Sequence, residues 1–220
     1  MKWRDSATNT VPAVLRGFLE TRSPRHIHHS EIDIKQWLAG PPSCGAVRPA
    51  CCPVCAAASR EPGRALVLVG HGLRERTVEG PPAPEQSPEA TPILSRRYRC
   101  RACGAIIIVV PRGVGRGLRY SLSAIAWALA LWGYARVAAT AVRARISTAR
   151  QVGAASATRW ASLRRWTRSA LRLFGYARDD AGTDRERAAG IAAFVASHAP
   201  VSAGPVVRDA FFGASFCSAD

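Results

Sequence analysis

Cys52-Pro53-Val54-Cys55 and Cys100-Arg101-Ala102-Cys103-Gly104 contain two Cys-x-x-Cys pairs, with 44 residues between them. A two-residue spacer lets a tight turn bring two thiolates together while backbone amides point at the sulfurs. Two such pairs supply the four ligands of a tetrahedral site, and thiolate is a preferred ligand of zinc. The spacing therefore predicts a zinc ribbon with one structural zinc ion on Cys52, Cys55, Cys100 and Cys103.

Three nearby residues leave the ligand set open. Cys44 and Cys51 stand close to the first pair, and His71 lies between the two pairs, so each is an alternative ligand. The spacing favours Cys52 over Cys51, because only Cys52 forms a two-residue pair with Cys55. A thioredoxin-like redox pair is the other interpretation, but neither pair lies between a predicted strand and a long helix.

The residues between the pairs predict a small sheet. Two β-rich runs, residues 64–69 and 73–78, flank Gly70-His71-Gly72 and predict a hairpin that turns at these glycines. Residues 80–92 are rich in proline and predict a surface insertion loop, and residues 106–110 predict a third strand. Because such a sheet is too small to be stable alone, zinc would supply folding free energy.

The charge is strongly positive, at +16, and its basic residues are almost all arginine because Lys2 and Lys35 are the only lysines. From residue 90 to residue 178 there are 17 arginines and no Asp or Glu. The planar guanidinium binds phosphate and guanine bidentately. This distribution predicts an anionic partner, and double-stranded DNA is the partner that we expect.

Three helical segments are expected after the linker at residues 111–117, namely residues 121–133, 134–146 and 157–174. On a helical wheel the third segment has one apolar face, formed by Trp160, Leu163, Thr167, Ala170, Leu171 and Phe174. A neighbouring arc is basic and contains Arg164, Arg165, Arg168 and Arg172. This pattern predicts a helix-turn-helix unit whose last helix enters the major groove; a solvated basic helix in an ordinary bundle is the alternative.

Several of these motifs together resemble the zinc-ribbon and helix-turn-helix front end of bacterial insertion-sequence transposases, and related stand-alone bacterial proteins of unknown function. The resemblance spans about residues 48 to 175. It is carried by Arg48-Pro49, Cys52-Pro-Val-Cys55, Gly70-His71-Gly72 with Arg74 and Arg76, Arg97-Tyr-Arg-Cys-Arg-Ala-Cys-Gly104, Tyr120-Ser121 and Arg159-Trp160 with Leu163-Arg-Arg-Trp166.

In that family the module binds transposon-end DNA, and a separate RNase H-like domain cuts the DNA with metal-binding carboxylates. The acidic residues after Arg178 fall within 42 residues, which is too short for such a catalytic sheet. No phosphate-binding loop, nucleophile elbow or His-Glu-x-x-His motif occurs either. We therefore expect a protein that is not an enzyme.

The expected fold is α+β and mainly α, with a small zinc-ribbon sheet followed by a three-helix, helix-turn-helix-like bundle. The expected division is an N-terminal polar segment (residues 1–43), the ribbon (44–110, with the 80–92 loop), the helical DNA-binding domain (118–176) and a C-terminal tail (177–220). Residues 26–29, a histidine cluster, are expected in the solvated N-terminal part.

The expected function is zinc-dependent DNA binding related to transposase recognition modules. The alternative is a protein–protein adaptor or accessory factor of a mobile-element or nucleoprotein complex, and a homodimer or a transposase is a further expected partner. RNA binding is a third interpretation, with Trp166 as the stacking residue. The expected DNA contacts are Arg159, Arg164, Arg165, Arg168 and Arg172 on the helix, and Arg96, Arg97 and Arg99 on the strand before the second knuckle.

Location is also predicted from the sequence. Seven cysteines, an odd number, and a start without an apolar run favour the reducing cytoplasm, where a DNA-binding protein is nucleoid-associated. The longest uncharged run, residues 120–135, is short for a membrane span and predicts a buried helix instead.

Overall fold

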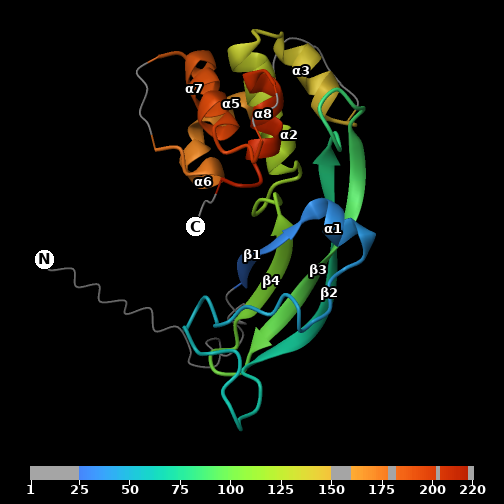
Figure 1. Cartoon of the computed structure of the whole chain (residues 1–220), viewed down its shortest axis with the longest axis vertical. Helices are drawn as coiled ribbons and strands as arrows, with labels where there is room; N and C mark the ends of the chain where they lie inside the picture. Colours follow the sequence, from blue (N-terminus) through green and yellow to red (C-terminus); the bar gives the residue numbers. More distant parts are fainter. Residues whose placement is uncertain (1–24, 150–159, 178–181, 202–203, 218–220) are drawn as a thin grey trace, which may run out of the picture.

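The computed structural model describes residues 25–149, 160–177, 182–201 and 204–217. A twisted sheet forms one end of the molecule, and most of the helices gather at the other end (Figure 1). The four strands are β1 (Arg25–Asp33), β2 (Leu68–Gly80), β3 (Glu89–Cys100) and β4 (Ile106–Arg112). The helices are α1 (Ile34–Ala39), α2 (Leu122–Leu129), the π-helical turn η2 (Ala130–Tyr134), α3 (Ala139–Ile146), α5 (Ala161–Arg168), α6 (Ala170–Phe174), α7 (Asp184–Ala196) and α8 (Val206–Gly213).

The sheet has the strand order β1-β4-β3-β2 and is mixed, because β1 runs parallel to β4 whereas the other pairs are antiparallel. The predicted three-stranded ribbon is therefore wrong. Residues 26–29, expected in a solvated segment, pair with β4 from Arg25 opposite Ile106 to His29 opposite Val110. β4 lies between two strands with both faces covered, which accounts for its continuous apolar sequence.

The hairpin was also predicted at the wrong glycines. β2 continues through Gly70-His71-Gly72 as one bulged strand, with Gly70 opposite Tyr98 and Leu73 opposite Arg96. Gly72 has a φ of 83°, a value that glycine tolerates and that suits a bulge rather than a chain reversal here. The connection between β2 and β3 lies at residues 81–88, so only part of the predicted insertion loop is loop and its last residues belong to β3.

The two faces of the sheet bury different residues. On one face Trp37 of α1 and Val47 of the following loop cover Tyr98, Ile107 and Val109. The Trp37 indole donates to the Leu94 carbonyl (2.9 Å), and the Tyr98 hydroxyl donates to the Cys44 carbonyl (2.7 Å). On the other face Val78, Ile93, Ile108 and Val110 pack with Val114. The loop after α1 is thus attached to the sheet by both apolar and polar contacts.

The helical end has α2 at its centre, and the predicted three-helix bundle is wrong. Every residue of α2 except Ser123 is buried, so the helix needs neighbours on all sides. α7 and α8, from the segment that we expected to be a tail, supply two of them together with α3 and α5. Ser121 caps the N-terminal end of α2, where its hydroxyl accepts a hydrogen bond from the Ala124 amide (3.1 Å).

The expected third helix is broken into α5 and α6 at Ser169. The Thr167 hydroxyl donates to the Leu163 carbonyl (2.8 Å), a bond that commonly bends a helix. The break changes the buried face, so that Leu171, expected in the core, is 62% exposed. Trp166, expected on the surface as a base-stacking residue, is buried against Tyr120 at a ring distance of 5.3 Å.

A buried carboxylate joins the sheet to the helices. Glu79, near the end of β2, is 1% exposed and accepts hydrogen bonds from the Arg119 guanidinium and the Thr148 hydroxyl. Its backbone N–H donates to the Arg119 carbonyl (2.7 Å), and its carbonyl accepts from the Ser121 amide (3.0 Å). These bonds connect β2 with the segment that enters α2 and with the residues after α3.

No helix of the described segments has both the length and the apolar character that crossing a membrane requires.

We predict that Gly213→Ala destabilises the helical end by about 1–3 kcal/mol, the usual cost of overpacking. A Cβ at Gly213 would overlap the Val195 carbonyl of α7, and backbone cannot move aside as a side-chain end can. Gly204→Ala is the matched control, because its Cβ would meet only Arg208 at an ordinary 3.5 Å. Chemical denaturation measures the stability of both variants. Equal unfolding midpoints for Gly213→Ala and Gly204→Ala would contradict the close packing of α7 and α8.

Candidate metal centre

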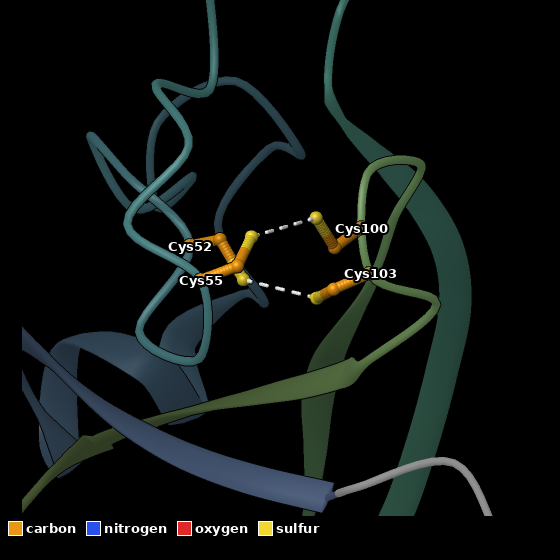
Figure 2. Close-up of side chains that lie close together, drawn as sticks. All are labelled: Cys52, Cys55, Cys100 and Cys103. Carbon is orange, nitrogen blue, oxygen red and sulfur yellow. Dashed lines mark hydrogen bonds between the residues drawn. The ribbon is translucent and has the colours of Figure 1, made fainter.

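The four predicted cysteine ligands come from two separate parts of the chain. Cys52 and Cys55 lie in the loop between α1 and β2, Cys100 ends β3, and Cys103 lies in the turn before β4. Figure 2 shows the four side chains directed toward a common centre, two from each side. The sheet therefore positions one pair, and the loop attached to it positions the other.

The spacing of the sulfurs suits a tetrahedral metal ion. The Sγ atoms of Cys52 and Cys103 are 3.8 Å apart, as are those of Cys55 and Cys100, and all four sulfurs lie within 4.8 Å of one another. A zinc ion with Zn–S bonds of about 2.3 Å places its thiolates about 3.8 Å apart. The four cysteines are therefore close enough to hold a metal ion.

The two knuckles have the same backbone form. Ala56 donates its N–H to the Cys52 carbonyl (2.8 Å), and Gly104 donates to the Cys100 carbonyl (2.9 Å). The residue after each pair is left-handed, with φ of 58° at Ala56 and 73° at Gly104. Glycine adopts this conformation freely, whereas alanine does so at a cost, so the first knuckle depends more on its surroundings.

The thiols differ in their tendency to ionise. Burial raises the pKa of Cys52, but backbone N–H groups of Cys55 and Val54 outweigh that effect and lower the pKa to about 7. The Ala105 amide favours the Cys103 thiolate, yet partial desolvation and the neighbouring sulfurs raise the pKa of Cys103 to about 12. Adjacent thiolates repel one another, so a cation at their centre is what allows all four to ionise together.

The other candidate ligands lie apart from this group. Within the part of the chain that the structure describes, the metal-ligating group contains only the four predicted cysteines. The Cys44 thiol is near Gly70 and is 3.9 Å from an Arg48 nitrogen, Cys51 is exposed, and His71 lies in the β2 bulge.

The arginines predicted to contact DNA fall into different surroundings. Arg164 and Arg168 on α5 lie 3.5 Å and 3.7 Å from the Asp184 carboxylate, although the sequence places no acidic residue near them. Arg165 donates to the Ser162 hydroxyl (3.2 Å), and Arg172 is exposed on α6. Asp184 begins α7, and only tertiary packing brings it to α5.

The strand arginines are placed differently again. Arg96 is half-buried and donates to the Pro42 carbonyl (2.7 Å), which attaches the loop after α1 to the sheet. Arg97 is half-buried and Arg99 is exposed, and they are two residues apart on β3. Arg159 lies outside the described residues.

A cleft that the sequence did not reveal lies where the sheet meets the helices. It has a volume of about 590 Å³ and is bordered by α1, the end of β2, the start of β3 and α8. Its exposed apolar side chains include Leu38, Val201 and Phe216. Phe211, Phe212 and Phe216, near the C-terminal end of the described residues, form part of its lining.

Comparison of the chain with protein-family models, with curated proteins and with solved structures gives no match.

We predict that Cys100→Ser abolishes metal binding and lowers the unfolding temperature, because a hydroxyl replaces a buried thiolate ligand. Cys51→Ser is the control, since this exposed cysteine lies outside the ligand group and its loss leaves one metal ion per chain. Elemental analysis and thermal unfolding with and without a chelator measure both effects. A metal-to-protein ratio unchanged by Cys100→Ser contradicts the assignment.

Proposed function

We propose that the protein is a zinc-dependent DNA-binding protein in which zinc has a structural role. The observation that carries the proposal is the combination of a four-cysteine group with a net charge of +16 that comes almost wholly from arginine. We propose no catalytic activity for it.

Zinc is the metal that suits four thiolates in a tetrahedral arrangement. Protein ligands occupy all four positions, so no position is left for water or substrate, which is the arrangement of a structural site. Bound zinc would join the loop of Cys52 and Cys55 to the sheet end at Cys100 and Cys103. The fold would gain stability that the small sheet cannot supply by itself.

The charge supports an anionic partner. Among the described residues, the arginines within 4 Å of a carboxylate include Arg64, Arg112, Arg119, Arg164 and Arg168. Many of the others are exposed, and DNA phosphates would neutralise them with the release of counterions. The proposal rests on this surface charge and on no helix-turn-helix, because the fold contradicts the three-helix unit.

A protein–protein adaptor is the second candidate, and the cleft between sheet and helices favours it. Leu38 is 44% exposed and Val201 is 72% exposed, so the cleft offers apolar surface to a partner. DNA binding ranks first because the net charge of +16 is large for a chain of this length, whereas the exposed apolar surface is local.

We predict that the metal-loaded protein binds duplex DNA of mixed sequence, with an affinity that falls steeply as salt increases. Each neutralised phosphate contributes about −0.9 to the slope of log K against log salt, so roughly six contacts give a slope near −5. Fluorescence anisotropy between about 50 and 200 mM salt measures it.

Chelator-treated protein is the control for zinc dependence and is expected to bind more weakly, because the sheet end loses the metal that joins it to the loop of Cys52 and Cys55. A slope near zero, or the absence of binding at low salt, contradicts DNA binding and favours the adaptor.

A further inference from the structure

We propose that the DNA-binding surface is one face of the sheet beside the metal centre, which we call the basic face: Arg25, Arg74, Arg97 and Arg99. The proposal rests on the DNA-binding function proposed above and locates it on the molecule. Three of the four side chains are exposed and Arg97 is half-buried.

The strand register places these arginines on one side of the sheet. Arg99 on β3 is opposite Ile106 on β4, which in turn is opposite Arg25 on β1. Residues directly opposite one another in a sheet project to the same side. Arg25 and Arg99 therefore lie on either side of Ile106. Their strands, β1 and β3, are the two neighbours of β4 in the sheet (Figure 1).

Two more arginines continue the same side along the strands. Arg97 lies two residues before Arg99, about 7 Å away along β3, and so projects to the same side. Ser95 lies two residues before Arg97, and Arg74 of β2 is opposite Ser95. The basic face thus draws side chains from β1, β2 and β3.

The bulge in β2 determines which charge reaches this side. Val69 is opposite Arg99 and projects with it; in a regular strand, residues 71, 73 and 75 would follow on that side. The extra residue at the bulge reverses the alternation, so that Arg74 projects to the basic face and Glu75, opposite Leu94, projects to the other side. The bulge therefore adds a cation to the face and removes an anion from it.

The charges on this face repel one another in the protein alone. Within the described segments, none of the four arginines is within 4 Å of a carboxylate. Burial lowers the pKa of the neighbouring Arg76, and the positive charge of Arg74 lowers it further. Arg76 instead donates to the Gly115 and Leu118 carbonyls. A polyanion would relieve this repulsion, so the complementary ligand is a phosphate backbone.

The residues between the arginines favour duplex DNA over a single strand. Ile27, Ile106 and Val69 lie among them on the same side, and these are aliphatic. Single strands are held largely by stacking on aromatic side chains, which this set of residues lacks. Arginines on a rigid sheet instead contact phosphates of a duplex, and Arg99 is held next to the metal ligand Cys100.

The experiment compares two triple variants that each remove three positive charges. Arg74→Gln, Arg97→Gln and Arg99→Gln alter the basic face, whereas Arg165→Gln, Arg168→Gln and Arg172→Gln alter α5 and α6. Anisotropy titrations use a fluorescent duplex of mixed sequence over about 50 to 200 mM salt. The sheet variant is expected to flatten the salt slope by roughly 3, about one for each lost contact, and the helix variant by less than about one.

Further variants distinguish a loss of DNA binding caused by lost charge from one caused by misfolding. Arg74→Lys with Arg97→Lys and Arg99→Lys keeps the charge and is expected to keep most of the salt slope. If the glutamine triple variant loses its metal, the single variants Arg25→Gln and Arg74→Gln, both distant in sequence from Cys100, are each expected to lower the slope by about one.

The outcomes separate the two proposals. Wild-type binding with an unchanged slope in the sheet variant, or in both single variants, overturns the basic face and leaves DNA binding in place. Equal losses in the sheet and helix variants overturn the basic face as well, because they indicate a general effect of charge. No binding by the wild-type protein overturns the proposed function together with the basic face.

Discussion

The approach of two sulfur pairs, one from a loop and one from a strand end, is the constraint on which the sheet end depends. Cys52 and Cys55 lie in a long segment between α1 and β2 that has little regular structure of its own. That segment covers one face of the sheet beside Trp37 of α1, with Val47 in the core and hydrogen bonds to the Pro42 and Cys44 carbonyls, and its two cysteines meet those of the sheet end at the four sulfurs. A metal ion held there would convert an entropically costly loop into a fixed layer and so stabilise the small sheet.

Because the loop after α1 covers only one face of the sheet, the two faces differ in burial and charge. The face beneath the loop after α1 is apolar and closed, with Tyr98, Ile107 and Val109 buried. The opposite face is apolar only near the helices, and toward the metal centre it becomes arginine-rich. Since β4 contributes to both faces, its apolar side chains support the closed core on one side and lie beside the arginines of the basic face on the other.

Helix packing places the arginines of the predicted recognition helix in surroundings that the sequence did not suggest. Four arginines on one arc suggested a surface for the major groove, and the absence of nearby acidic residues in the sequence supported that interpretation. In the fold, the N-terminal end of α7 brings Asp184 to Arg164 and Arg168. Ion pairs at such exposed positions contribute little stability, but they reduce the charge offered to DNA. Within the described segments, the four arginines of the basic face have no carboxylate within 4 Å, and this is why we place the DNA contact there.

The sequence by itself determined the local features: the four cysteines that gather into one group, the start of a helix near residue 121 and the strand character of residues 106–110. Each depends on residue type at a short spacing, which turn geometry, capping and side-chain periodicity make readable. Only the tertiary structure decided that residues 25–33 form a fourth strand, that Gly70-His71-Gly72 is a bulge, and that α7 and α8 complete the helical core. A parallel partner, the register across a bulge and a carboxylate that reaches α5 from α7 all depend on contacts between residues distant in sequence. Local propensity carries no information about those contacts.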